Sequence, residues 1–487
     1  MWTAFDRRYR HLTSRPFVAS TPFLVAGILA PISAWGFLLL LPGLLVGRRW
    51  MALGAALFAM GFVRQISAPL LPPPIETSDQ VIVGRIASTP NLALGSQRAL
   101  LEVGDRKLLL YESPQRPIMS GDWVRVHSKV RDIPAPQNAY WHRRGIAQMV
   151  DARYGGDLEI LAPGEGPATW GSIWREDMWS RLRRNLRPNT AGIAMGVIAG
   201  QQDLVDKSLI DAMMRTGTLH LLATSGFNVL ILAAGLMVLL SHFPISRSVQ
   251  IAIAMVILVS YADAVGGRPP VMRAAVMAAV YLGSFLFGRS TDLLSSLGLA
   301  AAIYLIAEPG AIFDAGFQLS FATVFGLGLF CPGAFALTRK FLAKRVRTGG
   351  PLFTANWIAA ALVTSCVAQV VSAPLIAAHF GIVSIIAPIA NILTSLAVPM
   401  IYLGAAAAQL FDKFAPSVGR GFDVLVTGPF AGWVEWVNGA MGSLSWSAID
   451  TGPVSAWVAG AALVGLLLLS RPQKRDLSLP EELPLQS

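Results

Sequence analysis

Long apolar runs separated by short polar or basic breaks make up most of the chain. A helix of about 20 apolar residues is long enough to cross a bilayer. Residues 1–70 contain apolar stretches with one basic break at Arg48-Arg49, a pattern that predicts about three spans. With the later runs, the pattern predicts a polytopic α-helical membrane protein of about 10 to 12 spans. The later runs, within residues 188–470, are Leu221–Leu240, Gln250–Val265, Val271–Phe287, Leu294–Ile306, Gln318–Phe330, Trp357–Ala378, Ile382–Leu410, Val424–Met441 and Val454–Leu469.

Residues 76–165 have a different pattern, in which short β-type runs are separated by turn residues. Gly104-Asp105 stands between two of these runs and predicts a hairpin. Several short strands in so few residues predict a small OB-like β-barrel domain inserted between membrane spans. The expected strands are Gln80–Ile86, Ala99–Val103, Leu108–Tyr111, Trp123–Val130 and Asp157–Leu161.

The positions of Lys and Arg assign a side of the membrane to each part, because basic residues accumulate in cytoplasmic loops. A basic N-terminus and Arg48-Arg49 on the cytoplasmic side place the exit of the third span, and therefore the barrel, outside the cytoplasm. Five later crossings return the basic cluster between Arg339 and Arg347 to the cytoplasm. Residues 471–487 are expected to be a disordered cytoplasmic tail. Val424–Met441 contains Glu435, so this run also suits a helix at the surface.

Residues 169–187 predict an amphipathic helix at the membrane interface. An apolar side is formed by Trp170, Ile173, Trp174, Met178, Trp179 and Leu182. The basic residues elsewhere on this helix are Arg175, Arg181, Arg183 and Arg184. Membrane lipid is the expected partner, and contact with a nucleic acid is the alternative.

Composition excludes a soluble globular protein, because 54% of the residues are hydrophobic, only 14% are charged and the mean hydropathy is +0.55. The formal charge of +11 is compatible with binding of nucleic acid or anionic lipid. Basic cytoplasmic loops alone also account for such a charge.

Polar residues inside predicted spans are the candidates for function, because burying them in a bilayer is costly. Thr216, His220, Thr224 and Asn228 recur every four positions, so a continuous helix would carry them as one polar stripe. Such a stripe would suit the lining of a transport pathway through the membrane. Hydrogen bonding between helices, supported by the neighbouring Ser225, is the alternative.

A second group of polar residues surrounds Pro269-Pro270, where Arg268 and Arg273 flank the start of a span. Guanidinium groups suit phosphate binding, and an ion pair with Asp263 would lower the cost of burial. Arginines that extend to the membrane surface are the alternative. Asp314 is expected to cap the next helix, where Gln318 and Ser320 follow.

Catalysis has little support in the sequence. His220 and Ser225 would lie about 140° apart on one helix, too far around it for a nucleophile and its base unless the helix breaks at Ser225-Gly226. No histidine pair has the spacing of metal ligands, and no Gly-rich loop is followed by Lys-Ser or Lys-Thr. We expect no enzyme, no metal and no cofactor.

Four ordered blocks resemble the ComEC-type competence proteins, and a short motif in the barrel region, Asn138-Ala139-Tyr140-Trp141, is also similar. These blocks are Gly200–Asp203 with Arg215–Val229, Arg268–Met277, Asp314–Ser320, and Pro374 with His379-Phe380-Gly381, Pro388 and Asn391. Asn228 stands where the family usually has a second histidine. Many members also end in a metallo-β-lactamase-like domain, for which we expect no residues here, so the chain resembles a short form.

The resemblance implies a channel in the bacterial inner membrane that takes up single-stranded DNA during natural transformation, with residues 188–470 as the channel domain. It further implies a surface DNA receptor of the ComEA type and a cytosolic motor or strand-binding protein as partners. The residues expected to line the path are His220, Thr224, Ser225, Asn228, Asp263, Arg268, Arg273, Gln318, Ser320 and Asn391. A transporter of a small anionic solute, or a membrane-embedded hydrolase or nuclease, are the alternative functions.

Overall fold

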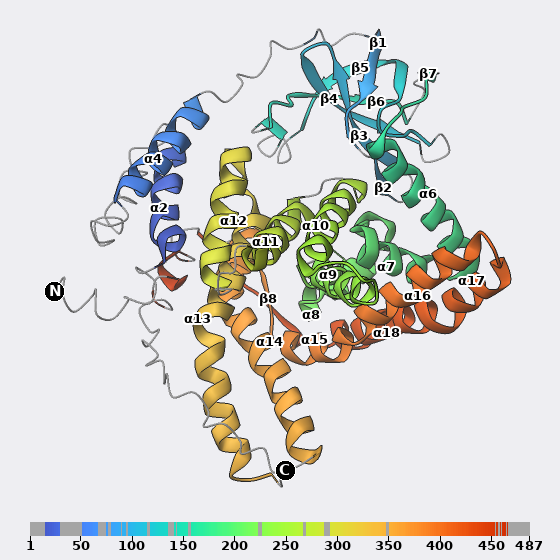
Figure 1. The fold of residues 1–487 in the computed structure, drawn as a ribbon. Helices are drawn as coiled ribbons and strands as arrows, with labels where there is room; N and C mark the ends of the chain where they lie inside the picture. Colours follow the sequence, from blue (N-terminus) through green and yellow to red (C-terminus); the bar gives the residue numbers. More distant parts are fainter. Residues whose placement is uncertain are drawn as a thin grey trace.

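In a computed structural model, a β-barrel lies at one end of a larger helical region (Figure 1). The helix α6 leads from the barrel into that region, and the long helices α13 and α14 run side by side toward the opposite end. The residues that the structure describes are 15–29, 51–66, 75, 79–88, 90–93, 96–113, 117–134, 141–142, 144–153, 157–222, 226–265, 269–286, 293–346, 350–452, 454–455, 458, 460–463 and 465.

Seven strands within the described residues form one sheet. Five of these described strands close a barrel in the order β1-β3-β4-β6-β5, because β5 also pairs with β1. Only the β4–β6 pair among the five is parallel. A closed five-stranded barrel is compatible with the expected OB-like domain. The strands are β1 (Asp79–Ile86), β2 (Asn91–Ala93), β3 (Ser96–Val103), β4 (Arg106–Glu112), β5 (Trp123–Asp132), β6 (Gln148–Asp151) and β7 (Asp157–Ala162).

The strict alternation of β5 explains why the barrel forms. Its even-numbered positions from Val124 to Val130 are buried, and its odd-numbered positions from Trp123 to Arg131 are exposed. Side chains of a strand point alternately to opposite faces, so this pattern gives one face to the core. The predicted hairpin at Gly104-Asp105 is confirmed, with Gly104 at φ 62. The sequence analysis did not find β2 or β6, and β6 is the strand that completes the closure.

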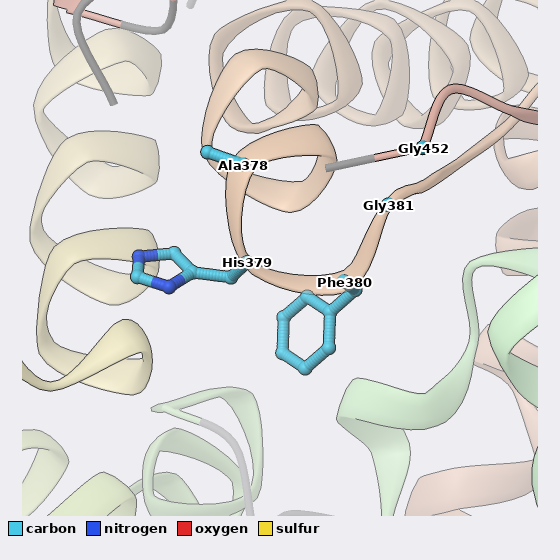
Figure 2. Close-up of a pocket in the computed structure, with 5 residues that line it drawn as sticks. All are labelled: Ala378, His379, Phe380, Gly381 and Gly452. Atoms are coloured by element: carbon cyan, nitrogen blue, oxygen red, sulfur yellow. The ribbon is translucent and has the colours of Figure 1, made fainter. Parts of the chain in front are cut away.

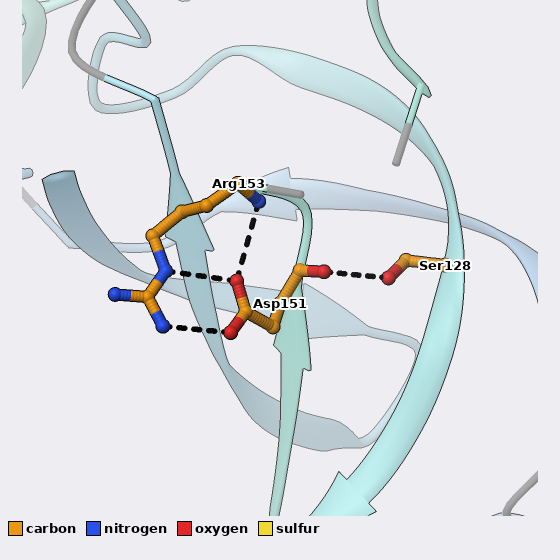
Figure 3. A network of polar contacts seen from close by, with 3 residues as sticks. All are labelled: Ser128, Asp151 and Arg153. Atoms are coloured by element: carbon orange, nitrogen blue, oxygen red, sulfur yellow. Dashed lines mark hydrogen bonds and ion pairs between the residues drawn. The ribbon is translucent and has the colours of Figure 1, made fainter. Parts of the chain in front are cut away.

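A pair of neighbouring residues fixes the end of β6 (Figure 3). Arg153 donates from Nε to Asp151 Oδ1 at 2.9 Å and from Nη2 to Oδ2 at 2.7 Å. The Asp151 carbonyl accepts from Ser128 Oγ on β5 at 2.8 Å. The side-chain hydrogen bond from Arg153 lowers the pKa of Asp151 below its usual value of 3.8.

The helices follow the apolar runs, with breaks that the runs do not show. Their bounds are α2 (Pro16–Leu29), α4 (Met51–Ile66), α6 (Pro167–Asn185), α7 (Pro188–Ala199), η3 (Gln202–Leu204), α8 (Lys207–Thr216), η4 (Leu219–Leu221), α9 (Gly226–Ser241), α10 (Arg247–Ala264), α11 (Pro269–Leu286), α12 (Leu293–Ala307), η5 (Pro309–Phe313), α13 (Ala315–Ala343), α14 (Gly350–Phe380), α15 (Ala387–Ser395), α16 (Ala397–Asp412), α17 (Pro416–Phe422), the π-helical turn η6 (Asp423–Thr427) and α18 (Gly428–Gly442). A two-stranded ribbon of β8 (Ile382–Ser384) and β9 (Ala448–Asp450) lies beyond α14.

Within the described residues, three helical segments are long and apolar enough to cross a membrane: Ala315–Ala343, Leu352–Phe380 and Ala387–Asp412. Shorter apolar helices occupy parts of the runs between residues 221 and 307. The predicted run Ile382–Leu410 is wrong at its start, where β8 and a turn precede α15. Half of the last predicted span, and residues 30–50 between α2 and α4, lie outside the described residues.

The helix α6 is present, but the expected distribution of its side chains is wrong. Arg175 and Arg181 are buried, whereas Trp170 is 69% exposed. Arg175 Nη2 donates to the carbonyl of Pro90 in the barrel at 2.7 Å, and Arg181 pairs with Asp423. Fixed partners in the fold explain why these two arginines are inside, because a buried charge needs a partner. A position for α6 in the membrane interface stays a prediction.

We predict that Asp151→Asn lowers the free energy of unfolding of the barrel at pH 7 by about 1 kcal/mol. The effect is small because the ion pair of Asp151 and Arg153 is partly exposed to solvent. Because the folded-state pKa is depressed, this stabilisation is complete above about pH 5 and is lost as pH falls through the folded pKa. Melting curves of the detergent-solubilised protein at pH 7 and at strongly acid pH measure the effect. An equal difference between the two proteins at both pH values would contradict it.

Candidate functional site

The predicted polar stripe through His220 does not exist as one helical face. The helix α8 ends at Thr216, and Gly217 adopts a left-handed conformation at φ 72 that ends the helix. A short 3₁₀ turn, η4, then carries His220, and α9 begins only at Gly226. His220 lies at the surface, with Nδ1 at 3.0 Å from the carbonyl of Gly217. The period of four residues is therefore interrupted by backbone geometry.

The turn before His220 is held by a buried amide on α18. Both Thr216 and Thr218 contact the side-chain oxygen of Asn438, and the hydroxyl of Thr218 donates to it at 2.6 Å. The amide nitrogen of Asn438 donates to Val434 O at 2.8 Å, which fixes the orientation of the amide. Thr216, Thr218 and Asn438 are fully buried. Buried polar groups that are all satisfied specify one local structure.

Arg273 and Asp314 form an ion pair between α11 and the start of α13. The distance from Nη1 to Oδ1 is 3.7 Å, and the side chain of Arg273 is only 3% exposed. The same Oδ1 accepts from the backbone N–H of Phe317 at 2.9 Å, so the expected N-cap is confirmed. A Cβ atom on Gly316 would lie 3.1 Å from Arg273 Nη2, so the guanidinium packs directly on the first turn of α13.

Gln318 links this first turn to the end of α14. Its Nε2 donates to Ile312 O at 2.8 Å, and its Oε1 therefore faces His379 Nε2, also at 2.8 Å. Because an amide oxygen only accepts, His379 must donate from Nε2. In the neutral imidazole, Nδ1 is then left as an acceptor. Arg273, Asp314, Gln318 and His379 thus connect α11, α13 and α14.

The barrel contacts the helical region next to this series. Arg144 Nη2 lies 2.6 Å from Glu308 Oε1, just beyond the end of α12. Tyr304 on α12 donates to the other carboxylate oxygen of Glu308 at 3.2 Å. A second contact joins β2 of the barrel to η3, where Asn91 Nδ2 donates to Asp203 Oδ2 at 3.2 Å. The barrel therefore contacts the segment between α12 and α13, which leads to Asp314, and the 3₁₀ turn η3.

The structure places the remaining predicted residues only in part. Ser320 lies on α13 in a half-buried position, and Asn391 Nδ2 donates to Ser365 Oγ at 3.2 Å. Thr224, Ser225 and Arg268 lie outside the described residues. Asn228 and Asp263 are described only as backbone of α9 and α10. The proposed pairing of Arg268 with Asp263 therefore stays a prediction.

Sequence reasoning missed four residues of this region: Arg144, Glu308, Asn438 and, as a site residue, His379. His379 belongs to one of the motifs that suggested the family, and this signal was sufficient to select it. Asn438 lies more than 200 residues from Thr216, so only the folded chain brings them together. Within the part of the chain that the structure describes, no group of three or more His, Cys, Asp or Glu side chains is placed to hold a metal ion.

Comparison with known proteins gives a consistent result. Residues 197–475 match the family model described as competence protein. The chain is also 29% identical over 307 residues to ComE operon protein 3 of Bacillus subtilis (strain 168). That similarity covers 60% of this chain and 36% of the relative, so the chain spans little more than a third of the length of the curated relative it matches. No solved structure matches the chain.

We predict that Asp314→Ala destabilises the protein by about 3 kcal/mol or more, because it leaves the buried Arg273 without its carboxylate and α13 without its cap. Asp314→Asn keeps a cap acceptor and should be milder by about 1 kcal/mol. Thermal unfolding in detergent measures both variants.

The matched test of the pair itself is the double variant Arg273→Met with Asp314→Asn. Its loss of stability should be smaller than the sum of the two single losses, because neither charge is then left unpaired. Additive losses would contradict a direct interaction between Arg273 and Asp314.

Proposed function

The chain belongs to the competence protein family, and we propose on this premise that it is a membrane channel through which single-stranded DNA enters the cytoplasm during natural transformation. The observation that supports this most is the series Arg273, Asp314, Gln318 and His379, which joins three helices at the end where the barrel docks. Polar side chains at bilayer depth mark pathways.

The chemistry of this series suits a polyanion. A guanidinium binds phosphate oxygens through several donors. Its pairing with Asp314 prevents a fixed, unbalanced positive charge from trapping the strand, and conduction requires sites that bind weakly enough to release. Gln318 and His379 offer further hydrogen bonds, and the exposed His220 offers another imidazole in the turn after α8. A passive conduit is consistent with such groups.

The distribution of charge along α13 supports an orientation of the protein in the membrane. Asp314 caps its first residue, and Arg339 and Lys340 lie near its end, about 40 Å away at 1.5 Å per residue. Because basic residues favour the cytoplasm, the end with Asp314 and the barrel faces outward across the inner membrane. The barrel then receives DNA outside the cytoplasm, with a receptor of the ComEA type as a partner. A cytosolic motor or strand-binding protein supplies directional movement.

Membership of this family associates the chain with DNA uptake rather than with catalysis. A test must therefore separate a strand channel from a transporter of a small anionic solute. Purified protein in sealed proteoliposomes should admit a fluorescent oligodeoxynucleotide to a lumen where added nuclease cannot reach it. In a transformable host, deletion of the gene should abolish internal DNA while labelled DNA still binds the surface.

We predict that His220→Ala lowers strand entry several-fold without affecting folding, because the side chain is at the surface. His242→Ala is the matched control, since His242 is also exposed and its Nδ1 also lies against a backbone carbonyl, that of Val238 at 2.9 Å, at the other end of α9. Entry of small anions with exclusion of oligonucleotides would refute the channel. Equal entry by the two variants would refute the role of His220.

A further inference from the structure

A surface hollow lies where α14 ends, beside the series of polar residues described above (Figure 2). It is lined by Ala378, His379, Phe380, Gly381 and Gly452 and has a volume of about 340 Å³. Figure 2 shows His379 and Phe380 leaving the last turn of α14 in different directions. We refer to this feature as the α14 hollow.

Two glycines keep the α14 hollow open. Gly381 and Gly452 have φ angles of 68 and 64, a conformation that other residues rarely adopt. A Cβ atom on Gly381 would lie 3.3 Å from the backbone of Gly452. The N–H of Thr451 donates to Gly381 O at 2.9 Å, and β8 pairs with β9 next to this contact. Among the described residues, one wall is therefore glycine backbone held by hydrogen bonds.

The other wall presents an aromatic ring and a hydrogen-bonding imidazole. Phe380 is 51% exposed, so one face of its ring is accessible to a ligand. His379 is exposed, and its bond to Gln318 leaves Nδ1 as an acceptor in the neutral ring. A flat ring beside an acceptor suits a flat heteroaromatic ligand that carries an amino group.

We propose that the α14 hollow binds a nucleobase of the strand in transit, with Phe380 as the stacking surface. This inference rests on the proposed function, because it names how the channel holds its cargo. Bases of every type have a face that stacks on an aromatic ring, so such a contact tolerates any sequence. Adenine, cytosine and guanine also offer an amino group that His379 Nδ1 can accept from.

The location agrees with this role. His379 joins the hollow to Gln318, and Gln318 lies one turn after Asp314 and its partner Arg273. A nucleotide bound here stacks its base on Phe380, and its phosphate contacts the neighbouring polar series. Stacking and charge recognition together are the usual means by which proteins hold single strands without reading sequence.

Binding of two oligomers to the full-length protein in lipid nanodiscs tests the proposal. One is a fluorescent oligodeoxynucleotide, and the other is an abasic oligomer of equal length and charge. The wild type should bind the first more tightly. Phe380→Ala should weaken binding of the base-bearing oligomer about tenfold and leave the abasic oligomer unchanged, since stacking on one ring contributes about that factor.

Matched variants separate stacking from damage to the fold. Phe380→Trp should retain the preference for bases. Phe353→Ala should behave as wild type, because Phe353 is also an exposed phenylalanine of α14 but lies near the other end of the helix. If Phe380→Ala weakens the binding of both oligomers equally, or of neither, the nucleobase site is refuted but the proposed DNA channel is not. If the wild type binds neither oligomer, the proposed function itself fails.

Discussion

The pairing of Arg273 with Asp314 determines the arrangement of the candidate site. A guanidinium that is almost fully buried in an apolar bundle needs a nearby negative charge, and Asp314 provides one at 3.7 Å. The same carboxylate begins α13 by capping it at Phe317. The start of α13 then fixes Gln318 one turn later, and Gln318 holds His379 at the end of α14. This ion pair and the hydrogen bonds that follow from it thereby connect α11, α13 and α14.

Polar side chains also make internal contacts at other places in the bundle where a helix is interrupted. Arg181 and Asp423 are both buried, and Asp423 also accepts from Asn185 Nδ2 at 2.9 Å at the first residue of the π-helical turn. Tyr261 and Tyr402 place their hydroxyls on the last carbonyls of α7, at Ile198 and Val197. Side chains therefore replace the hydrogen bonds that broken helices lose. Internal partners of this kind satisfy backbone groups that would otherwise be left without a hydrogen bond at the ends of short helices.

Sequence patterns predicted the features that depend on neighbouring residues. The hairpin at Gly104 and the cap at Asp314 follow from local chemistry, and both are confirmed. The stripe through His220 was wrong because a period of four assumes a continuous helix, and Gly217 ends α8. Burial of Arg175 was not predictable from its helix, since its partner is a carbonyl in the barrel. Contacts between distant segments carry no periodic signal.

The attachment of the barrel is uneven, and the difference bears on where the proposed DNA path would open. On the side of α6, the buried Arg175 donates to Pro90 O, and losing a hydrogen bond of a charged group inside the protein is costly. On the side of α12, Arg144 and Glu308 are 21% and 35% exposed, so water replaces their contact at little cost. Movement that opens space beneath the barrel would therefore separate Arg144 from Glu308 first. Because Tyr304 connects Glu308 to α12 and its neighbour α11, such an opening would lie next to the polar series rather than behind it.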